Sequence, residues 1–251
     1  DGLEIHHDGD LPARAGIGSS SAFTVGMIHG LYALKGIEVT KRQLALEAIH
    51  VEQGLIRETV GSQDQTFAAF GGFNLIEFGG PEKIQVRPVR ISEGRKQLLQ
   101  DHLLMFFTGF SRNASEVAAI QVKETPKKNS ELKAMHQMVQ EGLNILDSER
   151  DVGEFGQLLD ESWHIKRTLS NRISTAAIDE IYASACEAGA IGGKLIGAGG
   201  GGFMILFARP EHHDHIKERL RSLLFVPFKF EDEGSQIIFR NQDLEPTSSQ
   251  L

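Results

Sequence analysis

The sequence contains very little cysteine: Cys186 is the only one among 251 residues, so no disulfide can form within this chain. It also lacks any apolar run near the roughly twenty residues that a membrane-spanning helix needs. Basic residues are not in excess, because the net charge is −8. Nucleic acids and anionic membrane surfaces select a basic face. These absences argue against generic binding to either partner and indicate a cytoplasmic protein that acts on small molecules.

Apolar residues make up 40% of the sequence, enough to bury a substantial core. Segments with helical spacing and strand-like runs both occur, which predicts a mixed α/β (α+β) fold. We expect two lobes, and a monomer or a homodimer.

The spacing of apolar residues places the expected elements along the chain. Helices are predicted at 22–35, over about sixteen residues after the capping box that begins at Thr40, three or four times within 113–188, and near 211–224. Strands or strand-and-turn segments are predicted at 67–78, 85–91, 103–108, 203–208, 226–230 and 236–239.

Two glycines and three serines stand directly before the first predicted helix, in the segment LPARAGIGSSSA at 11–22. The backbone N–H groups and the dipole at a helix N-terminus attract anions. Glycine lets the backbone approach phosphate oxygens closely, and a serine hydroxyl can bind the Mg²⁺ that accompanies a nucleotide. The segment from Gly16 to Ser21, which we call the serine loop, therefore predicts an ATP site.

Two better-known phosphate loops fit this segment less well. A Walker loop requires a lysine after its second glycine, where this chain has Ser19. A dinucleotide fingerprint is only half matched, and no acidic ribose ligand is evident about twenty residues later. The other alternative is a glycine-rich turn that merely begins a helix.

A second polar cluster, at 61–65, places Asp64 between two amides, one of which is Gln63. The residues that follow are mostly apolar, so this cluster has little packing purpose. A carboxylate at the edge of a pocket can accept the proton of a sugar hydroxyl or hold that hydroxyl for attack. The alternative is an ordinary surface turn.

Five glycines occur within the six residues 197–202, which we call the glycine loop. The segment formally matches a dinucleotide fingerprint, but a strand-like run follows it instead of a helix. Glycines between two buried strands suit a loop that is pressed against another backbone or against a phosphate site.

These segments resemble, in the right order, motifs of the GHMP kinases, the family of galactokinase, homoserine kinase, mevalonate kinase and phosphomevalonate kinase. The second motif of the family reads Pro-x3-Gly-Leu-Gly-Ser-Ser-x-Ala, and only Ile17 departs from it here. The glycine loop resembles the third motif. The resemblance implies two lobes: a ribosomal-protein-S5-like N-terminal lobe at 1–92 and a C-terminal lobe of antiparallel sheet with helices at 93–251.

The resemblance also implies roles for particular residues. Mg²⁺ would be held by Ser20 and Glu52, and Asp64 would be the catalytic base. Family members carry a further segment before the serine loop, so we expect a truncated chain that is inactive without it. The residues implied to contact ATP are Pro12, Gly16, Gly18, Ser19, Ser20, Ser21, Gly199 and Gly200.

The residues of four segments, GSQDQ at 61–65, FGGFN at 70–74, TGFSR at 108–112 and GGKLIG at 192–197, resemble those of the heptose-phosphate kinase branch of the family. That resemblance implies phosphorylation of the anomeric hydroxyl of a heptose phosphate, although related L-fucose kinases share much of the wording. Because a phosphorylated sugar requires cations, we expect Arg112 and Lys166 to contact it.

Gln63 is the third residue expected to contact the sugar. Each cation taken alone could equally be an ordinary surface charge. A further alternative is a catalytically silent relative that senses a ligand, but the joint presence of Asp64, Glu52 and Ser20 argues against it.

Overall fold

A computed structural model of the chain describes residues 2–11, 16–80, 83–109 and 114–240. Its helices and antiparallel strands form two parts, each with its own cluster of buried apolar side chains. The predicted mixture of helices and antiparallel sheet is therefore confirmed.

The first part consists of helices and one hairpin. Thr40 caps the second helix, because its side chain accepts a hydrogen bond from the Gln43 N–H at 3.2 Å, as the capping box predicts. Val25, Leu44 and Ala69 meet in the buried cluster. The elements are α1 (Ser19–Leu34), α2 (Lys41–Ile49), the π-helix η1 (His50–Leu55), α3 (Gln63–Phe70) and the antiparallel pair β1 (Asn74–Phe78) and β2 (Ile84–Pro88).

The structure differs from the sequence-based expectation at two places in this part. The second helix is α-helical only as far as Ile49 and continues as η1. Residues 67–70, predicted as strand or turn, belong to α3, and the strand begins at Asn74. The apolar pair Phe67 and Phe70 is spaced three apart, which fits a short helix as well as a strand-and-turn segment. Asp64 therefore lies in the first turn of a helix.

The second part is a four-stranded antiparallel sheet with helices packed on it. The strand order is β4-β5-β3-β6, and Leu104 pairs with Leu206 at its centre. The elements are α4 (Glu93–Asp101), β3 (Leu103–Phe107), α5 (Ala114–Glu124), the 3₁₀ turn η2 (Thr125–Lys127), α6 (Asn129–Leu146), α7 (Gly153–Thr168), α8 (Ala176–Glu187), β4 (Ala190–Leu195), β5 (Phe203–Ala208), the 3₁₀ turn η3 (Pro210–His212), α9 (His213–Arg219) and β6 (Leu224–Phe225).

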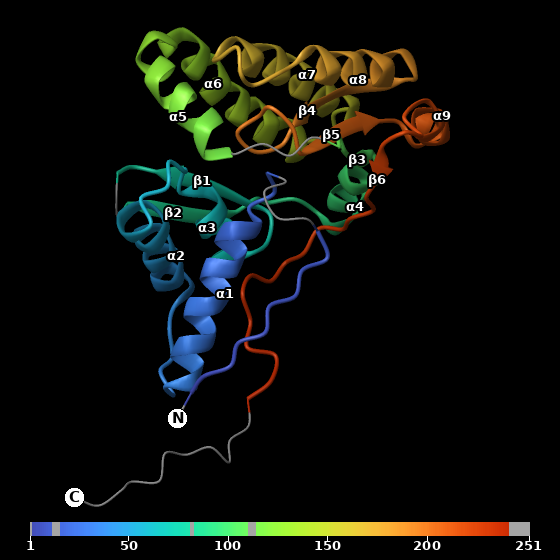
Figure 1. Cartoon of the computed structure of the whole chain (residues 1–251). Coiled ribbons are helices and arrows are strands. Elements are labelled where there is room, and N and C mark those ends of the chain that lie inside the picture. The colour runs from blue at the N-terminus through green and yellow to red at the C-terminus, as the bar shows by residue number, and fades with distance from the viewer. Residues whose placement is uncertain (1, 12–15, 81–82, 110–113, 241–251) are drawn as a thin grey trace, which may run out of the picture.

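Figure 1 shows α5 to α8 above this sheet and the first part below it. Within the second part, α7 lies close against β4. A Cβ built on Gly192 of β4 would lie 2.1 Å from the backbone oxygen of Gly156 on α7, so the approach requires glycine. Trp163, further along α7, is fully buried with Phe106 and Tyr182. The C-terminal end of α7 is thereby fixed beside the end of β4.

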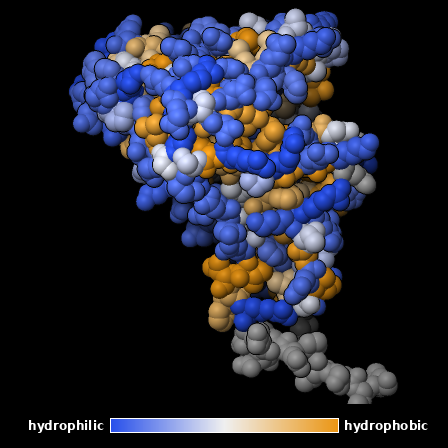
Figure 2. All heavy atoms as spheres, turned by 180° about the vertical axis from the view of Figure 1, so that it is seen from behind, coloured by the Kyte–Doolittle hydropathy of each residue, from blue (hydrophilic) through white to orange (hydrophobic). Residues whose placement is uncertain are grey.

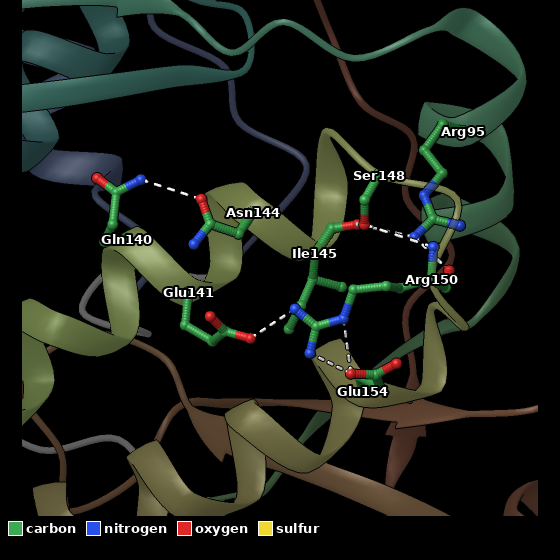
Figure 3. Close-up of polar contacts among 8 residues, drawn as sticks. All are labelled: Arg95, Gln140, Glu141, Asn144, Ile145, Ser148, Arg150 and Glu154. Carbon is green, nitrogen blue, oxygen red and sulfur yellow. Dashed lines mark hydrogen bonds and ion pairs between the residues drawn. The ribbon is translucent and has the colours of Figure 1, made fainter.

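Figure 3 shows the corner at which the chain passes from α6 to α7. Arg150 pairs with Glu141 of α6 at 2.7 Å and with Glu154 of α7. Arg95 of α4 donates to the backbone oxygens of Ile145, at 2.8 Å, and Arg150, at 2.7 Å. Solvent reaches the ion pairs, so each contributes little to stability. The bonds to backbone oxygens fix α4 against this corner.

Residues 226–240 run back from the second part to the first, beside α1 (Figure 1). The sequence predicts strands at 226–230 and 236–239, but neither segment is a strand. Val226, Phe228 and Phe230 alternate because one side of the extended segment packs against apolar clusters. The predicted helix at 211–224 is also shorter, since α9 ends at Arg219.

Figure 2 shows apolar side chains at the surface on the face opposite to that of Figure 1. Leu31 and Leu34 of α1 are exposed side chains, because the apolar residues of α1 do not keep to one face of the helix. No helix in the described part of the chain is long and apolar enough to cross a membrane.

Candidate functional site

The serine loop leads into α1, as the sequence predicts. Gly16 and Gly18 have φ values of 80° and 74°, in the left-handed region that favours glycine. The first bond of the helix runs from the Ala22 N–H to the Gly18 oxygen at 2.9 Å, so the N–H groups of Ser19 to Ser21 have no partner within the helix. Among the residues that the structure describes, no side chain caps this end, and no acidic residue lies in its first turn. An anion can therefore bind here.

Glu52 points its carboxylate at α1 from the π-helix η1, and it is only 1% exposed. The carboxylate accepts hydrogen bonds from Ser21 Oγ at 2.9 Å, from Thr24 Oγ1 at 3.0 Å and from Gln65 Nε2. Ser20, the predicted partner of Glu52, is exposed instead. Ser21 and Thr24 reach Glu52 together because residues three apart share a face of a helix.

Asp64 stands beside the serine loop, in the first turn of α3. A Cβ built on Gly18 would lie 3.1 Å from the Asp64 Cβ and 3.3 Å from its Oδ2. Asp64 as a whole residue is exposed. Partial burial of the carboxyl group and the nearby charge of Glu52 raise the pKa of the Asp64 carboxyl. The structure thus brings the predicted base to the helix end that can bind an anion.

The glycine loop joins β4 to β5 and touches the serine loop. Gly197 has a φ of 74°, and a Cβ there would lie 2.5 Å from the backbone oxygen of Gly16. Gly199 and Gly200, two of the predicted ATP contacts, pack on Ile173: the Gly200 N–H donates to the Ile173 oxygen at 2.9 Å. The contact between the two loops is therefore made by the first glycine of the glycine loop.

The remaining predicted site residues are placed differently. Gln63 begins α3 and is exposed beside Asp64. Lys166 is 8% exposed, and its Nζ donates to two backbone oxygens at the end of β4, at 3.1 and 2.7 Å. Pro12 and Arg112 lie outside the described residues.

Sequence reasoning missed Thr24 and Gln65, which complete the surroundings of Glu52. Both are buried polar residues. Thr24 is a polar residue in a largely apolar helix, three positions after Ser21, and this spacing was the signal available. Gln65 offered no such signal beyond its place next to Asp64.

The chain matches the model of the GHMP kinase N-terminal domain over residues 1–72 and the model of the GHMP kinase C-terminal domain over residues 127–224. The chain therefore belongs to the GHMP kinase family, and its kinase relatives indicate an ATP-dependent kinase of small molecules.

Three known proteins, among others, are similar to this chain. A D-glycero-alpha-D-manno-heptose 7-phosphate kinase of Campylobacter jejuni is 31% identical over 236 residues, which cover 92% of this chain and 69% of the relative. A bifunctional fucokinase/GDP-fucose pyrophosphorylase of Arabidopsis thaliana is 27% identical over 87% of this chain and 21% of the relative.

The third relative has a solved crystal structure and is a D-glycero-D-manno-heptose 1-phosphate kinase from B. thetaiotaomicron. It superposes with a TM-score of 0.68 at 25% identity, and the match covers 90% of this chain and 64% of that one. The chain thus spans about two thirds of the heptose kinases that it matches.

Proposed function

We propose that the protein transfers the γ-phosphate of ATP to the anomeric hydroxyl of D-glycero-D-manno-heptose 7-phosphate. The product would be the 1,7-bisphosphate, an intermediate for a nucleotide-activated heptose. The observation that carries the proposal is the convergence of three features at the start of α1: the N–H groups of Ser19 to Ser21, which have no partner within the helix, the buried carboxylate of Glu52 and the carboxylate of Asp64. The similarity to the Campylobacter jejuni kinase supports heptose 7-phosphate as the acceptor.

The serine loop would bind the phosphates of ATP through the N–H groups at the start of α1. The glycine loop would support it from the other side, because Gly197 contacts Gly16 backbone to backbone. The positive end of the helix dipole lies where negative charge must be held.

The surroundings of Glu52 fit a divalent cation. Its three described partners, Ser21, Thr24 and Gln65, are all neutral, although a buried carboxylate normally requires a cation or a metal. The Oε1 atom of Gln65 is buried without a hydrogen-bond partner among the described residues. Mg²⁺ prefers oxygen ligands and needs few carboxylates, and when bound it would neutralise charge on the phosphates. Glu52 with Ser20 or Ser21 would hold it.

Asp64 is the base in the proposed reaction. Its carboxylate takes the proton of the anomeric hydroxyl, and the sugar oxygen forms a bond to the γ-phosphorus. The bond between that phosphorus and the β–γ bridging oxygen breaks, and ADP leaves with the electron pair. A raised pKa suits this role, because a base that binds a proton more strongly removes it more readily.

The test measures ADP release from Mg·ATP by the full-length natural polypeptide, with D-glycero-D-manno-heptose 7-phosphate or L-fucose as acceptor. Asp64→Asn removes the proposed base, and Asp214→Asn, a change at a fully exposed side chain, is the matched control. We expect turnover with the heptose phosphate, lost in Asp64→Asn alone. Equal turnover by Asp64→Asn would reject Asp64 as the base.

An L-fucose 1-kinase is the second candidate, and the similarity to the Arabidopsis fucokinase favours it. Turnover with L-fucose alone would keep the kinase and replace the substrate. Binding of ATP without turnover of any sugar would instead indicate a ligand sensor.

A further inference from the structure

Lys166 is a buried lysine that the proposed reaction does not use. It lies in the last turn of α7 and is 8% exposed. A lysine head group this deep normally requires a carboxylate or several hydrogen bonds. Here Nζ donates to the backbone oxygens of Leu195, at 3.1 Å, and Gly197, at 2.7 Å.

These two oxygens belong to the place where β4 passes into the glycine loop. The next hairpin bond, from the Ile196 N–H to the Phe203 oxygen at 2.8 Å, fixes the same turn from the side of β5. Lys166 thus holds this end of the hairpin from α7, and α7 is itself fixed against β4 by the Gly156 and Gly192 contact.

The turn held by Lys166 is also the part of the glycine loop that touches the serine loop. Gly197 leaves no room for a side chain against the Gly16 backbone, so a movement of Gly197 must move Gly16 or open a gap. Gly16 lies two residues before Gly18, where α1 begins. One line of contacts therefore runs from α7 through Lys166 and Gly197 to the helix end proposed to bind ATP.

We propose that Lys166 is a positioning residue for the nucleotide, which acts by holding Gly197 against Gly16, and that it does not contact the sugar. This inference rests on the proposed binding of ATP at the serine loop. It differs from the role that the sequence predicts for Lys166, because the ammonium donates to backbone oxygens of the glycine loop.

The experiment uses the full-length polypeptide and three variants. Lys166→Met keeps the length of the side chain and removes both hydrogen bonds. Lys166→Gln keeps an N–H donor for one of the oxygens and carries the test if the methionine variant does not fold. Lys133→Met, at an exposed position of α6, is the matched control.

We expect the KM for ATP to rise about tenfold in Lys166→Met, which corresponds to about 1.4 kcal/mol of lost binding. Lys166→Gln should fall between wild type and Lys166→Met. The KM for the sugar should change less than about twofold, and Lys133→Met should match wild type. A purely structural role would lower the melting temperature and leave the KM for ATP unchanged, which would overturn the inference. So would a rise in the KM for the sugar alone, because Lys166 would then act on the acceptor.

Calorimetry with a non-hydrolysable ATP analogue and Mg²⁺ separates this inference from the proposed reaction. If wild type turns over no sugar but binds the analogue about tenfold more tightly than Lys166→Met does, the reaction is wrong and the positioning role stands. If wild type turns over the heptose phosphate and Lys166→Met binds the analogue equally well, the reaction stands and the positioning role is wrong. If wild type does not bind the analogue, both are wrong.

Discussion

Burial raises the pKa of Asp64, and repulsion from the nearby carboxylate of Glu52 adds to this effect. Asp64→Asn removes the negative charge that burial and Glu52 disfavour in the folded state. We expect the variant to lose about 10²- to 10⁴-fold in kcat, the usual contribution of a general base. Its melting temperature at pH 7 should equal or exceed that of wild type, because the repulsion from Glu52 is gone.

The measurement pairs ADP-release kinetics with thermal unfolding of the same preparation. A lower melting temperature for Asp64→Asn would show that the ionised carboxylate stabilises the fold, and the assigned repulsion would be wrong.

Lys166 should make the stability of the fold depend on pH. Burial, with a smaller effect of Lys194, lowers the pKa of Lys166 from 10.5 to about 7. The unfolded chain therefore holds more protons than the folded chain between about pH 7 and 10.5, so the free energy of unfolding rises as the pH rises through this range. Below pH 7 both states are charged and this dependence ends.

Urea unfolding between pH 7 and 9.5 measures the effect. Lys166→Met should show a smaller rise with pH than wild type, and Lys133→Met should show the same rise. The rise should not vanish in Lys166→Met, because burial also lowers the pKa of Lys194. Equal slopes for wild type and Lys166→Met would contradict the prediction.

Single residues were predictable from the sequence where a local pattern determines the geometry. Gly16 and Gly18 are examples, because a glycine-rich turn before a helix constrains only its neighbours. The sequence did not show whether Ser20 or Ser21 would bond to Glu52, since this depends on which face of α1 meets η1. Lys166 was identified as functional, but its burial depends on the packing of α7 against β4, which no local spacing shows.

At the scale of elements, the glycine loop and α1 should respond to alanine in opposite ways. Gly197→Ala would place a Cβ 2.5 Å from the Gly16 oxygen, at a φ of 74°. We expect it to destabilise the fold by about 1–3 kcal/mol and to weaken ATP binding, because the serine loop must move. Gly26→Ala, in the middle of α1, has nothing within 4 Å and should stabilise the fold by about 0.5–1 kcal/mol.

Denaturant midpoints and calorimetric ATP binding test the pair. Gly26 is the matched control, because the same substitution is made where space and backbone conformation allow it. Unchanged ATP binding in a folded Gly197→Ala would show that the contact between the two loops does not position the nucleotide.

Elements were predictable in type where an apolar pattern or a cap was strong, as at Thr40 and in the buried strands β3 and β5. The π-helix η1 was not, because its wider turn is favoured by the contacts of Glu52 with α1 and α3 and not by a local pattern. The strands predicted within 226–240 were wrong, because an alternating apolar pattern indicates that one side of a segment is buried but does not show that it pairs with another strand.

At the scale of the whole molecule, residues 231–235 connect the segment that follows β6 to the first part. The Gly72 N–H donates to the Glu231 oxygen at 3.1 Å, and the Ser235 N–H donates to the Ala68 oxygen at 2.9 Å. The Ser235 hydroxyl also lies 2.9 Å from His29 Nδ1 on α1. These contacts surround the C-terminal end of α3, the helix whose first turn carries Asp64.

Gly234→Ala tests whether this segment holds α3 in place. A Cβ on Gly234 would lie 2.4 Å from the Ala69 oxygen, too close for any side chain, so the segment must move away from α3. We expect faster amide hydrogen exchange over 63–72, a stability loss of about 1–3 kcal/mol and a lower kcat, because Asp64 is no longer fixed beside Gly18. Gly94→Ala in α4, where a Cβ meets nothing within 4 Å, is the control and should leave all three unchanged or slightly improved. Faster exchange at 63–72 with an unchanged kcat would show that Asp64 keeps its position without the C-terminal segment, and that the two parts of the molecule are joined for stability alone.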